Sequence, residues 1–296
     1  MKRGRIADAV ATGRVLVSDG AWGTLLQKKG LRPGQCPELW CVDHPHEVLG
    51  IARAYIDAGA DMVETDSFGG SRCKLAHYGL GERTAEINEA AARVSRQAAG
   101  DAHWVIASLG PTGKMLLLED ISEDEMVAAF AEQAVALEKG GADALCIETM
   151  SAIDEATLAL RAARENTALE VIATFTFERT LQGEYRTMMG VSPQQAAKAM
   201  RDAGADIVGT NCGNGMQGMI DIVREMRAAC PDTPILVHAN AGLPVHADGV
   251  DVFPETPDDM ARQVPALVAA GANIIGGCCG TTPEHIAAIA AAVRRL

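Results

Sequence analysis

The residues best suited to chemistry in this sequence are cysteines. The 296-residue chain contains eight, and two of them, Cys278 and Cys279, are adjacent and flanked by glycines. A third, Cys212, follows another short apolar segment. The chain is long and has no signal-peptide pattern, so these cysteines are more typical of metal ligands or reactive thiols than of disulfides.

Three thiolates at one point favour zinc. Soft sulfur ligands select Zn²⁺ over hard cations, and three protein ligands leave the fourth tetrahedral position open, as in catalytic sites. Zinc held by three thiolates is a weak Lewis acid, but it would keep a substrate thiol deprotonated for alkyl transfer to sulfur. Most free cysteines are instead small buried residues. We assign that role to the other five, which are Cys36, Cys41, Cys73, Cys146 and Cys230.

A repeated pattern predicts the elements that bring the three cysteines together. Ala-rich helical segments end in Gly-Ala-Asp or Gly-Ala-Asn before a short apolar run, at Gly59, Gly141, Gly204 and Gly271. Glycine at a helix C-terminus followed by a strand is typical of a βαβ unit. Four more apolar runs begin at Val15, Trp104, Val171 and Ile235. The sequence therefore predicts eight strands.

The segments between these strands have helical periodicity. Examples are residues 47–58, 124–139, 152–164, 193–203 and 283–295. Alternating helices and apolar strands indicate a parallel sheet, and eight such units predict a single (β/α)₈ TIM barrel with its active site at the carboxyl ends of the strands. A doubly wound sheet is the alternative, but its Gly-x-Gly-x-x-Gly motif is missing. No low-complexity linker divides the chain, so we expect residues 1–296 to form one domain.

Composition and charge limit the partners. The hydrophobic fraction of 48% with 22% charged residues indicates a folded protein. A net charge of −13 disfavours nucleic acid and anionic membranes. No apolar run approaches the roughly 20 residues that span a bilayer, and no targeting segment is recognisable. We expect a cytoplasmic protein with no nucleic-acid or membrane partner.

Polar residues end several of the predicted strands. Asp19 and Glu148 are candidates to hold a substrate ammonium group, although each could equally be a solvated or structural carboxylate. Backbone N–H groups at Gly20 and Ala21 could receive a substrate carboxylate, as turn amides commonly do. Asn240 is either a zinc ligand or a turn residue.

Seven motifs along nearly the whole chain carry a family resemblance. They are DGAWGTLLQ from Asp19, AGADMVETDSFGG from Ala58, SLGPTGK from Ser108, IETMSAIDEA from Ile147, GTNCG from Gly209, ANAGLP from Ala239 and GGCCGTTPEHI from Gly276. Together they resemble the homocysteine S-methyltransferase family, and most closely the homocysteine-binding barrels of cobalamin-dependent methionine synthases. The last motif is the most specific.

The resemblance implies a zinc-dependent methyltransferase that acts on the thiol of homocysteine and gives methionine. It implies Cys212, Cys278 and Cys279 as zinc ligands, and Asn240 as a residue that can occupy the metal before substrate arrives. It implies no catalytic group beyond the zinc-activated substrate thiol. The residues that it places around the amino-acid end of homocysteine are Asp19, Gly20, Ala21, Ser108 and Glu148.

Two positions bear on the methyl donor. Family members commonly carry Asn-Thr-Phe where this chain has Asp66-Ser67-Phe68, so we expect Asp66 to add charge near the mouth of the barrel and to affect the choice of donor or acceptor. Relatives that use S-methylmethionine commonly have Arg at the position of Gly280. A glycine there is expected to leave the mouth open for a bulky donor.

The chain stops at Leu296 without a folate barrel or a corrinoid-binding module, so we expect it not to be a complete methionine synthase. The predicted donor is a methylated corrinoid such as methylcobalamin, which this chain does not bind stably and which a separate corrinoid protein presents. The alternatives are S-methylmethionine or betaine as donor, or another thiol acceptor. Outside enzymes, the alternative is a zinc-binding interaction module.

Overall fold

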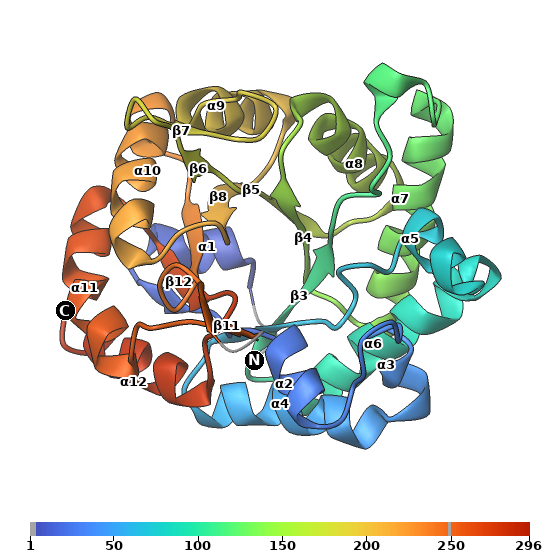
Figure 1. Cartoon of the computed structure of the whole chain (residues 1–296), viewed down its shortest axis with the longest axis horizontal. Helices are drawn as coiled ribbons and strands as arrows, with labels where there is room; N and C mark the ends of the chain where they lie inside the picture. Colours follow the sequence, from blue (N-terminus) through green and yellow to red (C-terminus); the bar gives the residue numbers. More distant parts are fainter. Residues whose placement is uncertain (1–3, 248–249) are drawn as a thin grey trace.

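The computed structural model describes residues 4–247 and 250–296. Its main sheet has eight strands in the order β1-β12-β9-β8-β5-β4-β3-β2, and each strand runs parallel to the next in this order. These strands are β1 (Leu16–Val17), β2 (Met62–Glu64), β3 (Trp104–Leu109), β4 (Ala144–Met150), β5 (Glu170–Phe175), β8 (Ile207–Asn211), β9 (Ile235–Ala239) and β12 (Ile274–Gly277). Figure 1 looks down the ring that they form. The predicted (β/α)₈ barrel is confirmed.

Helices surround this ring on the outside (Figure 1). The long ones are α4 (Pro45–Asp57), α6 (Thr84–Ala99), α7 (Glu123–Gly140), α8 (Ile153–Asn166), α9 (Pro193–Ala203), α10 (Met216–Ala229), α11 (Pro257–Ala270) and α12 (Pro283–Val293). Three of them, α7, α9 and α11, begin with a capping box and end at a glycine with positive φ. A capping box favours the start of a helix, and a glycine with positive φ favours its end before the next strand begins. Within the described residues, no helix is long and apolar enough to cross a membrane.

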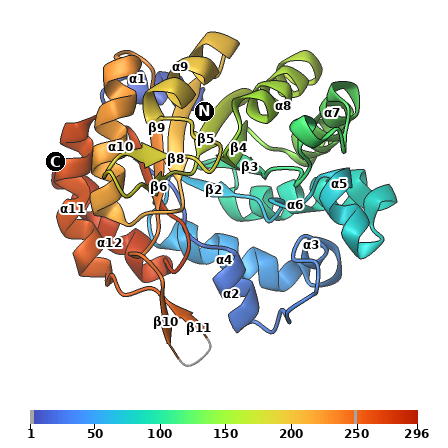
Figure 2. The same ribbon diagram turned by 45° about the horizontal axis from the view of Figure 1, so that its top comes forward.

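Shorter elements complete the ends of the barrel. They are α1 (Ile6–Ala11), α2 (Gly23–Lys28), α3 (Trp40–Asp43), α5 (Arg72–Leu75), the hairpin of β6 (Glu178–Arg179) and β7 (Tyr185–Arg186), and the hairpin of β10 (Val245–Ala247) and β11 (Val250–Val252). Figure 2 shows the β10–β11 hairpin projecting beyond the rest of the molecule. The hairpin follows β9 along the chain, so it belongs to the loops at the carboxyl ends of the strands.

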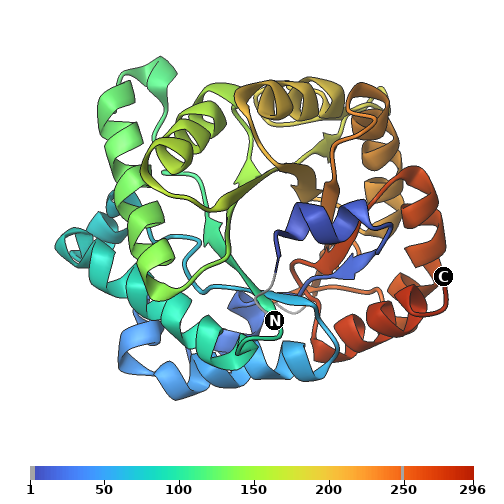
Figure 3. The same cartoon turned by 180° about the vertical axis from the view of Figure 1, so that it is seen from behind.

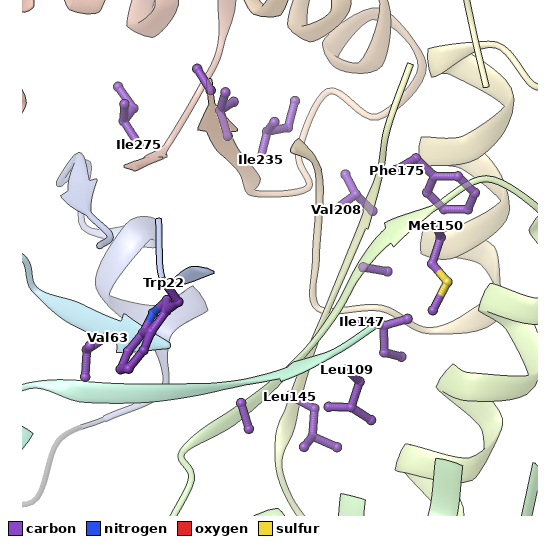
Figure 4. Close-up of a cluster of buried hydrophobic side chains, with 14 of the residues drawn as sticks. Trp22, Val63, Leu109, Leu145, Ile147, Met150, Phe175, Val208, Ile235 and Ile275 are labelled. Atoms are coloured by element: carbon purple, nitrogen blue, oxygen red, sulfur yellow. The ribbon is translucent and has the colours of Figure 1, made fainter. Parts of the chain in front are cut away.

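Strand side chains alternate between two apolar cores. One face packs against the helices, with Val63, Leu145 and Ile275 among its buried members (Figure 4). The other face fills the interior of the barrel, where Leu16 and Met62 are fully buried. Because successive side chains of a strand point to opposite faces, this period of two separates the cores.

Helix α1 closes the amino-terminal end of the barrel, and Figure 3 shows it lying across that end. Ile6 and Val10 of α1 belong to the interior core. The Glu170 carboxylate accepts hydrogen bonds from the backbone N–H groups of Ile6 and Ala7, at 2.5 and 3.0 Å. Among the described residues, α1 therefore blocks the amino-terminal end, and a ligand would reach the interior from the carboxyl ends of the strands.

The interior becomes polar toward that open end. Two residues beyond the apolar side chains on β2, β3, β4, β5 and β9, the same face carries Glu64, Ser108, Glu148, Thr174 and His238. All five are buried. A polar layer inside a barrel is typical of a binding site, because buried polar groups require partners.

Candidate functional site

The three cysteines singled out in the sequence come together at the open end of the barrel. The Sγ atoms of Cys212, Cys278 and Cys279 all lie within 4.8 Å of one another, and those of Cys212 and Cys279 are 3.8 Å apart. In residues 4–247 and 250–296, no other group of His, Cys, Asp or Glu side chains meets this ligand spacing. The remaining five cysteines are free thiols outside the cluster, and all but Cys73 are buried.

Strand β9 positions both cysteine-bearing segments. The backbone N–H of Cys212 donates to the carbonyl of His238 at 3.0 Å, and that of Cys278 donates to the carbonyl of Ala239 at 2.7 Å. Cys212 has a φ of 58°, in the left-handed region that residues other than glycine rarely adopt. Such a conformation persists where the surroundings fix it, and it turns the Cys212 side chain toward the other two thiols.

The three thiols of the cluster influence one another's protonation, and hydrogen bonds with Cys212 raise the pKa of Cys278 and raise that of Cys279 to about 11. Hydrogen bonds from Cys278 and Cys279 lower the pKa of Cys212, and a side-chain hydrogen bond with Asn240 adds to this effect. Oδ1 of Asn240 is buried and has no hydrogen-bond partner among the described residues. A buried oxygen without a hydrogen-bond partner, next to three thiols, is a suitable fourth ligand for a metal ion that prefers sulfur.

Glu148 of β4 lies close to the cluster and is held by side chains of β3 and β8. The Ser108 hydroxyl and the Asn211 amide both donate to its carboxyl group, the latter at 3.2 Å. Burial raises the pKa of Glu148 to about 7. Asn211 also accepts a hydrogen bond from the backbone N–H of Thr149 at 2.8 Å, where φ is 60°. Asn211 thus fixes the end of β4 and with it Glu148, a role that only its position beside Cys212 hinted at in the sequence.

Asp19 connects the ends of β1 and β2 by a hydrogen bond. Its Oδ2 accepts hydrogen bonds from the backbone N–H of Glu64 at 2.8 Å and from the Trp22 indole at 3.0 Å. The residue is fully buried, and burial raises its pKa to about 7. Asp19 therefore lies in the predicted region, but its oxygens are engaged with donors of the protein itself. Its contact with substrate stays a prediction.

The turn after β1 packs against the start of α12. The Ala21 N–H donates to Thr281 Oγ1 at 3.0 Å, so this amide already has an acceptor. A Cβ atom on Gly20 would lie 2.7 Å from the same oxygen, which explains why glycine occupies this position. The binding of a substrate carboxylate by Gly20 and Ala21 stays a prediction, and at Ala21 it requires that Thr281 give up its hydrogen bond.

The structure places Asp66 in a buried position beside Cys41. Its side chain is buried, and Cys41 Sγ donates to Oδ2 at 3.8 Å. Burial, and next the charge of Glu38, raise the pKa of Asp66 well above its usual range. A raised pKa weakens the charge that this carboxyl group can add near the mouth, and its effect on the choice of donor or acceptor stays a prediction.

Gly280 packs closely against an aromatic side chain. Its φ is 81°, and a Cβ atom there would lie 2.3 Å from Cγ of Phe253. The space that a side chain at position 280 would take is therefore filled by Phe253, and access of a bulky donor beside Gly280 stays a prediction. Glycine is required here by a left-handed backbone and a close aromatic neighbour. The sequence could not show this, because Phe253 is 27 residues away along the chain.

The fold and site together define a (β/α)₈ barrel with a thiol cluster at the carboxyl ends of its strands, and comparisons identify the family. The profile of the homocysteine S-methyltransferase family matches residues 16–293. The chain therefore belongs to the homocysteine S-methyltransferase family. It is 32% identical over 305 residues to a methionine synthase of Mycobacterium tuberculosis, and the match covers 97% of this chain and 25% of that protein. For a methionine synthase of Mycobacterium leprae the identity is 31%, with coverages of 95% and 24%.

The chain thus spans about a quarter of the length of these relatives. Among solved structures, the metallated form of the homocysteine methyltransferase MmuM from Escherichia coli superposes with a TM-score of 0.77. The sequence identity is 24%, and the match covers 96% of this chain and 98% of that one. At this identity the likeness establishes the barrel fold.

Proposed function

We propose that this chain transfers a methyl group to the thiol of homocysteine, giving methionine, with zinc held by Cys212, Cys278 and Cys279. The observation that carries the proposal is the cluster of three thiols within 4.8 Å, beside a buried carboxyl group, in a chain of this family. Zinc bound there would lower the pKa of an incoming thiol, so that the sulfur is a nucleophile at neutral pH.

The residues around the cluster would bind and orient the substrate. Asn240 Oδ1, which has no hydrogen-bond partner among the described residues, is suited to occupy the fourth position until the substrate thiol replaces it. Glu148 would pair with the substrate ammonium group, and Ser108 would hold Glu148 in place through its hydroxyl. These contacts leave the substrate sulfur facing the mouth, where a methyl donor can approach.

The proposed donor is a methylated corrinoid presented by a separate protein. Support comes from the similarity to methionine synthases and from the rim of the barrel mouth. Loops after β3, β5 and β9 carry exposed large apolar side chains, which are Met115, Leu117, Leu118, Leu181, Met188, Met189, Leu243 and Val245. Exposed apolar side chains on loops at the carboxyl ends of the strands are available for contact with another protein.

A panel of donors tests this proposal. Zinc-loaded protein and homocysteine are mixed separately with methylcobalamin, a methylcorrinoid protein, S-methylmethionine, S-adenosylmethionine, betaine and methyltetrahydrofolate, and methionine is measured. We expect turnover with the corrinoid donors, and none for Cys279→Ala. Turnover with a small donor alone would reject the corrinoid, and the absence of methionine from every donor would reject the methyltransferase.

A further inference from the structure

Glu64 presents a buried carboxyl group without a hydrogen bond. It ends β2 on the interior face of the barrel, and its Oε1 is buried with no hydrogen-bond partner among the described residues. The nearest ionisable nitrogen is Nδ1 of His238, 3.6 Å away and beyond hydrogen-bond distance. A buried carboxyl group in this state is costly unless something else supplies the missing donor.

The other two acids of the polar layer differ from Glu64 in this respect. Asp19 accepts hydrogen bonds from an indole, a backbone amide and a hydroxyl group. Glu148 accepts from a hydroxyl group and a side-chain amide. Of the three, Glu64 is therefore the acid with a buried side-chain oxygen that has no hydrogen-bond partner among the described residues.

A partner for Glu64 must enter from the mouth. Below Glu64 lies the apolar interior core that α1 closes, with Met62 and Ile106 fully buried. The Glu64 side chain nevertheless keeps 9% of its surface accessible, compared with 2% for His238. Because α1 and the apolar core fill the other end, we infer that this accessible surface faces the open end of the barrel.

The charge around Glu64 favours a cation as its partner. Glu148 and Asp19 are close enough that, after burial itself, their charges raise the pKa of Glu64 well above its usual range. A positive group placed among three carboxyl groups relieves this repulsion and stabilises their ionised forms. A primary ammonium group fits because it is compact and has three N–H donors.

We propose that Glu64 binds the substrate ammonium group directly, together with Glu148, and makes the site selective for amino thiols. This inference rests on the proposed function. Asp19 then acts as a positioning residue, because its carboxylate holds the backbone N–H of Glu64. A thiol of the same length without the amine would leave Glu64 unpartnered.

Calorimetry with two thiols tests the proposal. Zinc-loaded protein is titrated with homocysteine and with 4-mercaptobutanoate, which lacks only the amino group. We expect wild type to prefer homocysteine, and Glu64→Gln to bind homocysteine roughly 10–100-fold more weakly while its affinity for 4-mercaptobutanoate changes less than about twofold. Glu170→Gln is the matched control, since it neutralises a buried carboxyl group at the closed end of the barrel and should leave the preference unchanged.

A second variant separates binding from folding. Glu64→Met replaces the unpartnered acid by an apolar side chain of similar volume, so its melting temperature should equal or exceed that of wild type while the preference for homocysteine is lost. Equal losses for both thiols, or an unchanged preference in both variants, would overturn the role of Glu64. If neither thiol binds to wild-type zinc-loaded protein, the proposed function itself fails and this inference with it.

Discussion

Two buried carboxyl groups near the thiol cluster, Asp19 and Glu148, have pKa values raised to about 7 by burial. In the free protein they are therefore partly protonated at neutral pH. An ammonium group bound beside them favours their ionised forms and lowers these pKa values. Substrate binding should then release protons from carboxyl groups as well as from the thiol.

The number of protons released is consequently expected to depend on pH. Near pH 8 Asp19 and Glu148 are mostly ionised, so these two groups release few protons when homocysteine binds, and the thiol contributes about one. Near pH 6 the carboxyl groups contribute more, and the affinity falls as the pH is lowered. Calorimetry in buffers of different ionisation enthalpy counts these protons, and a count that is the same at both pH values would contradict the assigned roles.

Removing the charge of Glu148 gives a second prediction at this scale. Glu148→Gln should weaken homocysteine binding by about 2–5 kcal/mol, because a largely buried ammonium group loses its partner. Asp19→Asn should also weaken binding, through its contact with Glu64. Zinc content should stay at the wild-type value in both variants. Loss of zinc, or unchanged affinity, would count against the assignment.

At the scale of elements, the strands and their glycine-ended helices could be predicted because each leaves a local signal. The apolar runs and the Gly-Ala-Asp repeats predict all eight barrel strands, and α9 begins and ends at the predicted residues 193 and 203. The convergence of Cys212 with Cys278 and Cys279 followed from the same alternation.

The contacts between elements could not be predicted in the same way. Glu64 was recognisable as a strand-end acid, but its lack of a hydrogen bond depends on what β9 places opposite it. Phe253 against Gly280, and Asp66 against Cys41, bring together segments with no common motif. Such pairs depend on register and loop packing, which a single sequence does not specify.

The packing of Phe253 leads to a prediction for Gly280→Ala. A left-handed φ disfavours any Cβ by about 1–2 kcal/mol, and the clash with Phe253 adds to this. Gly79→Ala is the matched control, because φ there is 70° and nothing lies within 4 Å of the added atom. Urea unfolding should show a larger loss of stability for Gly280→Ala. Equal losses in the two variants would mean that Phe253 does not pack as described.

At the scale of the whole molecule, the barrel has two extensive apolar cores that are independent of the thiol cluster. A domain with such cores does not need a metal ion to fold, unlike a zinc finger. The metal proposed here therefore serves chemistry, and the fold serves to position its ligands at the open end.

Replacing a ligand should separate these two roles. Cys212→Ala, Cys278→Ala and Cys279→Ala should each lose most of the bound zinc while retaining the far-ultraviolet circular dichroism of wild type. Cys230→Ala is a suitable control, since Cys230 is a buried cysteine outside the cluster. Zinc content unchanged in all three ligand variants would reject the proposed site, and unfolding of all three would assign the metal a structural role.

The most direct test of the central claim is X-ray absorption at the zinc edge, with and without homocysteine. The account predicts three sulfur ligands at about 2.3 Å and one lighter ligand in the free protein, changing to four sulfur ligands when homocysteine is added. A sulfur count that stays at three in saturating homocysteine would contradict it.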